Sequence, residues 1–129
     1  MKKIYLSIAK TSSPDVIGDV KQFLHTKGYN IHWYEGGKYH PEIVTDNDMV
    51  IVIPPADRFK EEITVPSYLV RVGKGQHGEI NKAIEIALPV YMIHELSMKI
   101  YPIDKCVVIN PADFQYGSEA TILNDPIEP

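Results

Sequence analysis

The sequence predicts an α/β fold in which a parallel sheet of about five strands carries helices on both faces. Two observations predict it. Apolar, β-branched runs alternate along the chain with segments of helical periodicity, which is typical of strands joined by crossover helices. The run Met49–Pro54 is apolar throughout, as expected of a strand that is covered on both faces.

Length and composition narrow the function classes. A chain of 129 residues fits one domain, residues 1–129, and is long enough to bury a hydrophobic core. With 13 basic and 17 acidic side chains, the chain lacks the excess of positive charge that is typical of proteins that bind nucleic acid or a membrane surface. No apolar run approaches the roughly 20 residues that span a bilayer, and the start of the chain indicates a strand rather than a signal peptide. With a single cysteine, Cys106, we expect a cytoplasmic protein without an internal disulfide.

The first half of the chain gives the clearest element boundaries. Lys3–Ile8 predicts the first strand. A helix then opens at Pro14, with Ser13 as its N-cap and Gly28 just past its end. One helical face is apolar and consists of Val16, Ile17, Val20, Phe23 and Leu24. Asn30–Glu35 predicts the second strand, and Met49–Pro54 the third.

The second half is less regular. Residues 55–76 predict a long loop with a possible short strand pair around "ITVPSYLVRVG", and a loop of this length is often functional or an assembly surface. A second helix is expected after Gly78, ending at Pro89. Residues 89–93 predict the fourth strand and Cys106–Asn110 the fifth, while the tail has a weak pattern.

The carboxyl edge of such a sheet is the expected ligand site, because the loops that follow parallel strands gather there. The loops predicted to line this pocket are residues 9–13, 34–39, 54–57, 75–79 and 94–98.

Glu79 is the main candidate for chemistry, and the pattern leaves two interpretations open. An acid in the first turn of a helix gains about 0.3–1 kcal/mol from the helix dipole, so Glu79 has an ordinary structural explanation. However, Gly73, Gly75 and Gly78 are more glycines than a cap requires, and they would let a ligand approach the backbone. Glu79 also lies beside the apolar stripe, from which it could point into the pocket.

Three short motifs resemble the nucleoside 2-deoxyribosyltransferase superfamily. They are "KIYLS" at residues 3–7, "NDMVIVIP" at 47–54 and "VGKGQHGEINKA" at 72–83, and the resemblance covers roughly Lys3 to Ile93. It implies a flavodoxin-like sheet and a homo-oligomer. It also implies cleavage or transfer at the N-glycosidic bond of a 2′-deoxynucleoside, or of its 5′-monophosphate as in the N-glycosidase relatives. Glu79 would be the nucleophile and Asp48 the second active-site acid.

Several side chains at the predicted pocket are candidates for binding a nucleoside or nucleotide. Lys10 and the serines beside it precede a helix N-terminus, where a phosphate could bind; the alternative is an ordinary serine cap with a solvated lysine. The candidate binding residues are Ser7, Lys10, Ser12, Ser13, Tyr34, Pro54, Gly75 and His77. The five histidines show no metal-ligand spacing, so we expect neither a metal nor a cofactor.

Two further functions fit the same sequence. One is a nucleotide-binding or sensing module that keeps the pocket without turnover. The other is a protein-interaction role that uses residues 55–76 as the contact surface.

Overall fold

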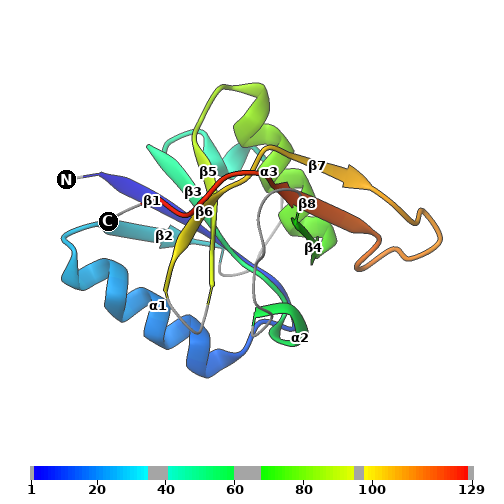
Figure 1. The fold of residues 1–129 in the computed structure, drawn as a ribbon. Helices are drawn as coiled ribbons and strands as arrows, with labels where there is room; N and C mark the ends of the chain where they lie inside the picture. The colour runs from blue at the N-terminus through cyan, green and yellow to red at the C-terminus, as the bar shows by residue number, and fades with distance from the viewer. Residues whose placement is uncertain (1, 35–40, 60–67, 95–97, 128–129) are drawn as a thin grey trace.

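The computed structural model describes residues 2–34, 41–59, 68–94 and 98–127. The α/β class is confirmed, with a mostly parallel five-stranded sheet between helices (Figure 1). In chain order the elements are β1 (Lys3–Ile8), α1 (Pro14–Thr26), β2 (Asn30–Trp33), the 3₁₀-helix η1 (Pro41–Val44), β3 (Met49–Ile53), α2 (Ala56–Phe59), β4 (Tyr68–Val72), α3 (Lys74–Glu85), β5 (Val90–Ile93), β6 (Ile100–Pro102), β7 (Lys105–Val108) and β8 (Ser118–Ile122).

The main sheet has the strand order β2-β1-β3-β5-β6. Strands β2, β1, β3 and β5 are parallel, and the reversal of order at β1 is that of a flavodoxin-like sheet. The fifth strand was predicted at Cys106–Asn110, and this prediction is wrong for the main sheet. Its place is taken by β6, which runs antiparallel to β5. The chain between β5 and β6 is too short for the crossover of a dozen or more residues that a parallel strand requires.

Residues 106–108 of that prediction belong instead to β7, in a second sheet of order β4-β8-β7. This sheet is antiparallel throughout, and β4 confirms a strand within the segment that was predicted to be mostly irregular. Its inner face packs on α3 through residues that are buried together with Ile80 and Ala83 of the helix. These are Val70, Val72, Cys106, Ala120 and Ile122.

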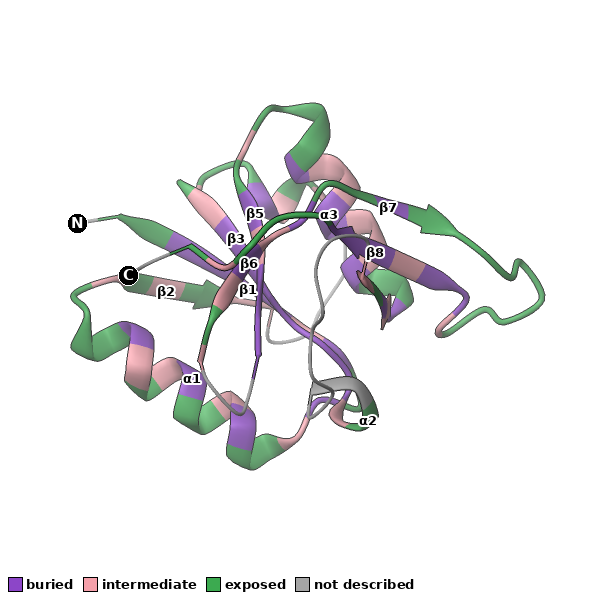
Figure 2. Cartoon of the chain, in the orientation of Figure 1, coloured by how far each residue is buried: buried purple, intermediate pink, exposed green. Residues whose placement is uncertain are grey.

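Helix α1 covers one face of the main sheet. Its buried side chains Val16, Val20 and Leu24 belong to one apolar cluster with the β1 side chains Ile4 and Leu6. Buried and exposed stretches alternate along α1 (Figure 2). The predicted boundaries are confirmed, because the Ser13 side chain accepts a hydrogen bond from the backbone of Val16 and Gly28 has a left-handed φ of 86°. Local signals alone therefore define this helix.

Helix α3 covers the opposite face and lies between the two sheets (Figure 1). It begins at Lys74 with Gly73 as its N-cap, so the predicted start after Gly78 is wrong. Glu79 therefore lies in the second turn rather than the first. Glycine lowers helix propensity by about 1 kcal/mol, which is why the sequence indicated a later start. Tertiary hydrogen bonds of Gln76, described below, extend the helix through Gly75 and Gly78. None of the helices in the described ranges has the length and apolar character needed to cross a membrane.

Candidate functional site

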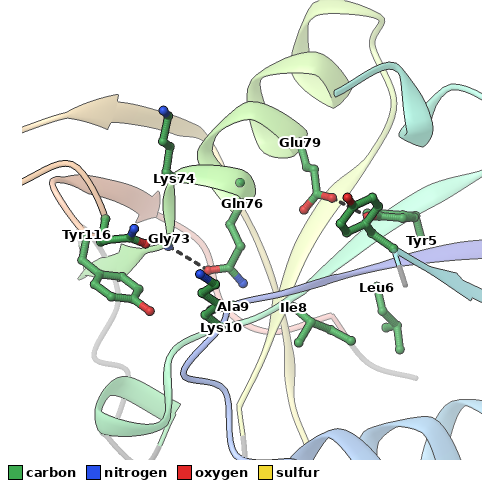
Figure 3. Close-up of a pocket in the computed structure, with 13 residues that line it drawn as sticks. Tyr5, Leu6, Ile8, Ala9, Lys10, Gly73, Lys74, Gln76, Glu79 and Tyr116 are labelled. Atoms are coloured by element: carbon green, nitrogen blue, oxygen red, sulfur yellow. Dashed lines mark hydrogen bonds between the residues drawn. The ribbon is translucent and has the colours of Figure 1, made fainter. Parts of the chain in front are cut away.

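A cavity of about 250 Å³ lies beside the carboxyl-terminal half of β1, where the sequence predicted a pocket (Figure 3). Four parts of the chain line it: β1 with the loop that follows, Tyr34 after β2, the first turns of α3 with Gly73, and the loop between β7 and β8. The residues that line it are Tyr5, Leu6, Ile8, Ala9, Lys10, Tyr34, Gly73, Lys74, Gly75, Gln76, Glu79, Gln115 and Tyr116.

Glu79 is buried at this cavity, with 4% of its surface exposed. Two hydroxyl groups of β1 hold its carboxylate. The Ser7 hydroxyl donates to Oε1 at 2.6 Å, and the Tyr5 hydroxyl donates to Oε2. Tyr5 and Ser7 are two positions apart on a strand, so their side chains point to the same face, toward α3. Within the described ranges, none of the ion pairs of the chain involves Glu79.

Burial raises the pKa of Glu79 from its ordinary value of 4.5 to about 7. Removal of water disfavours the charged carboxylate, and the hydrogen bonds from Ser7 and Tyr5 oppose this effect only in part. Near neutral pH the side chain is therefore divided between the acid and the carboxylate. A carboxyl group with this balance can act as a base, an acid or a nucleophile.

Gln76 anchors α3 to the ends of two strands. Its amide nitrogen donates to the backbone oxygens of Ser7 (3.0 Å) and Ile53 (2.7 Å), and its oxygen accepts from the N–H of Gly73 (2.9 Å). The side chain is almost fully buried, so these bonds replace water completely. They fix the position of α3 against β1 and β3, and with it the position of Glu79.

Ser12 joins the loop after β1 to the end of β3. Its buried hydroxyl accepts from the N–H of Ala9 at 3.0 Å and lies within donating distance of the backbone oxygens of Ile53 (3.1 Å) and Pro54 (3.2 Å). Pro54 is buried there as well. Ser13 caps α1. These three predicted binding residues therefore shape the loop and are outside the cavity lining.

Asp48 is not among the residues that line the cavity of Glu79. It precedes β3 and is exposed, and its carboxylate accepts a hydrogen bond from the backbone N–H of Lys3 at 2.7 Å. Parallel strands begin at one edge of the sheet and end at the other. Along β1, Lys3 comes two positions before Tyr5 and four positions before Ser7, the latter about 13 Å at the rise of a strand. The structure does not bring the two predicted catalytic acids together, because Asp48 lies at the edge of the sheet where the parallel strands begin.

His77 faces the second sheet rather than the cavity. Its Nδ1 lies 3.5 Å from the Cys106 Sγ, and its Nε2 lies 3.0 Å from the Asn81 side-chain nitrogen. Burial raises the pKa of the Cys106 thiol to about 12, so the sulfur is a protonated, packed group, as the sequence indicated.

Of the predicted binding residues, Lys10, Tyr34 and Gly75 line the cavity, and Ser7 bonds to Glu79. Predicted pocket positions 35–39 and 95–97 lie outside the described residues. In the described ranges, His, Cys, Asp and Glu side chains form no group of three or more that could hold a metal ion.

Sequence reasoning missed Tyr5, Gln115 and Tyr116, while Gln76 lay in the predicted pocket loop 75–79 but was given no role. The alternation of β1 contained a signal for Tyr5, because it shares a face with Ser7. Gln115 and Tyr116 come from the weakly patterned tail, where no local signal placed them at this site.

Comparisons with protein-family models, with curated proteins and with solved structures found no match to this chain.

Proposed function

We propose that the protein cleaves or transfers the N-glycosidic bond of a 2′-deoxynucleoside or its 5′-monophosphate, with Glu79 as the nucleophile. One observation carries this proposal. Glu79 is buried at a cavity on the expected edge of the sheet, and two hydroxyl donors orient its carboxylate. A carboxylate needed only for helix stability would gain little from burial, which costs free energy unless the charge is compensated.

The chemistry proceeds in two displacements. An oxygen of ionised Glu79 attacks C1′ of the sugar, the C1′–N bond breaks, and its electron pair leaves with the base. A glycosyl ester on Glu79 results. Water or a second base then attacks C1′, and the C1′–O bond electrons return to the Glu79 carboxylate. The positive charge that develops on the sugar in each step is stabilised by the negative carboxylate.

Tyr5 and Ser7 would position the nucleophile for this attack. Each carboxylate oxygen accepts one hydroxyl hydrogen bond and keeps a lone pair for C1′. In the second displacement the same donors would stabilise the leaving carboxylate. Within the described part of the cavity lining, Glu79 is the only carboxyl group, so the departing base would receive its proton from water or from a hydroxyl or ammonium group.

The ionisation of Glu79 sets the expected pH dependence. Only the carboxylate is nucleophilic, and the pKa of Glu79 is about 7. Cleavage should therefore increase as the pH rises through 7 and then level off.

The test is release of free base from a panel of 2′-deoxynucleosides and their 5′-monophosphates, followed by chromatography. Glu79→Ala and Glu79→Gln should abolish release. Glu85→Gln is the matched control, because Glu85 lies on the same helix and is exposed.

Absence of release by the unaltered protein across the panel would refute the proposal. Binding of panel members without release, retained in Glu79→Gln, would indicate the nucleotide-binding module instead. Of the interaction surface considered at residues 55–76, positions 60–67 lie outside the described residues.

A further inference from the structure

The loop between β7 and β8, residues 109–117, is a tightly hydrogen-bonded unit. The N–H groups of Ile109 and Asn110 donate to the Gly117 oxygen at 2.6 and 2.9 Å. One oxygen of Asp113 accepts from the N–H groups of Gln115 (3.2 Å) and Tyr116 (2.9 Å). A Cβ on Gly117 would lie 2.1 Å from the backbone oxygen of Asn110, so this turn requires glycine.

Two hydrogen bonds fasten this loop beside the cavity that contains Glu79. The N–H of Lys74, the first residue of α3, donates to the Gln115 oxygen at 2.9 Å. The Tyr116 hydroxyl lies 2.9 Å from the Thr11 hydroxyl in the loop that follows β1. The loop is thus hydrogen-bonded both to the start of α3 and to the loop that follows β1, two segments that contribute to the cavity lining.

Tyr116 belongs to the lining of two cavities. It lines the cavity of about 250 Å³ that contains Glu79, and it also lines a neighbouring cavity of about 230 Å³. The second cavity is bounded by Leu69, Arg71 and the loop itself. The ring lies against the start of α3, since a Cβ built on Gly73 would be 3.5 Å from the Tyr116 Cε1 (Figure 3).

Tyr116 is held in this position from both sides. In addition to its bond with Thr11, its ring lies 5.4 Å from the Arg71 guanidinium, on the side of the second cavity. A cation near an aromatic ring contributes roughly 0.5–1 kcal/mol at a partly exposed site. The ring is therefore a fixed partition rather than a freely rotating side chain.

We propose that Tyr116 selects the size of the ligand that reaches Glu79, so that the site takes single-ring pyrimidine bases in preference to double-ring purines. This inference rests on the proposed function. With Tyr116 present, the cavity is smaller than the roughly 300–1,000 Å³ typical of ligand pockets, so a smaller base fits it better. Removing the ring would join the two cavities and provide the space that a purine needs.

The kinetic test compares pyrimidine and purine 2′-deoxynucleosides with the unaltered protein and with Tyr116→Ala. The preference for pyrimidines should fall by about tenfold or more in kcat/KM, mainly through a lower KM for purines, as expected when a pocket gains space. Tyr116→Phe, which keeps the ring and loses only the bond to Thr11, should retain the preference. Val108→Ala is the control at the base of the loop, because Val108 is 52% exposed and lines neither cavity.

A second measurement does not depend on turnover. Carbodiimides react with protonated carboxyl groups, so a small and a bulky water-soluble carbodiimide are used to label Glu79 near pH 6.5. Mass spectrometry of the tryptic peptide 75–82 reports the labelling. Tyr116→Ala should speed labelling by the bulky reagent several-fold more than labelling by the small one. If Tyr116→Ala does not fold, judged by circular dichroism, Tyr116→Val serves in both experiments.

Equal labelling ratios in the unaltered protein and in Tyr116→Ala would overturn the proposed partition. An unchanged base preference in Tyr116→Ala would do so as well. If the unaltered protein releases no base but the labelling ratio shifts as expected, the proposed function fails and the partition by Tyr116 stands.

Discussion

Replacing Glu79 with glutamine should change how stability depends on pH. The free energy of unfolding of the unaltered protein includes the cost of ionising a buried carboxyl group whose pKa is raised from 4.5 to about 7. Below pH 4.5 the group is protonated in both the folded and the unfolded chain, and there is no cost. Between pH 4.5 and 7 the unfolded chain releases the proton first, so stability falls as the pH rises.

The magnitude follows from the difference between the two pKa values. At 1.36 kcal/mol for each pH unit, the full loss of stability is about 3 kcal/mol, and it is complete above pH 7. Glutamine is nearly isosteric and does not ionise, so Glu79→Gln should lack this decline. Relative to the unaltered protein, its stability should increase by about 3 kcal/mol between pH 4.5 and pH 8.

Urea unfolding at several pH values between 4 and 8 measures this difference. Glu85→Gln is again the control, because Glu85 is exposed on the same helix and should show no comparable pH dependence. A stability difference between Glu79→Gln and the unaltered protein that stays constant over this range would refute the reasoning. It would mean that Glu79 ionises in the folded protein as easily as in the unfolded chain.

Three other substitutions test the surroundings of Glu79. Tyr5→Phe removes a hydrogen bond to the carboxylate, so the pKa of Glu79 should rise further. NMR titration of the Glu79 carboxyl carbon measures this pKa, and an unchanged value would contradict the hydrogen bond. Gln76→Leu removes three hydrogen bonds to buried backbone groups and should cost about 2–3 kcal/mol in urea unfolding, whereas a neutral effect would argue against the anchor. Gly117→Ala places a Cβ against the Asn110 oxygen and should lower the free energy of unfolding by about 1–3 kcal/mol in the same measurement. Unchanged stability would show that the loop backbone shifts to make room for the Cβ.

The parts of the fold that local chemistry specifies could be predicted from the sequence. Helix α1 begins and ends where Ser13, Pro14 and Gly28 indicate, because capping and turn preferences act within a few residues. The apolar run of β3 likewise indicated a central strand. Both features depend on neighbours in the sequence.

The second sheet could not be predicted in the same way. Strand β4 pairs with β8, far along the chain, and no local pattern reports such a partner. The start of α3 depends on bonds between Gln76 and the ends of β1 and β3, which outweigh the glycines beside it. Tertiary contacts of this kind also bury Glu79, which the sequence placed at a helix entrance.

In the candidate site, too, some features follow from local sequence and others depend on tertiary contacts. Glu79 was identified from its glycine-rich surroundings, and its cavity lies at the expected edge of the sheet. Asp48 was chosen as its partner from a motif, but a residue before a parallel strand lies at the opposite edge from a residue that follows one. Tyr116 reaches the cavity only because the second sheet carries its loop there.

The most direct measurement of the central claim is a search for the covalent intermediate on Glu79. The protein is mixed with a 2′-deoxynucleoside, quenched in acid within the first turnovers, digested with trypsin and analysed by mass spectrometry. The peptide 75–82 should carry one added deoxyribosyl group at Glu79, and the Glu79→Gln peptide should carry none. Base release without any sugar on this peptide, or with the sugar on another residue, would contradict Glu79 as the nucleophile.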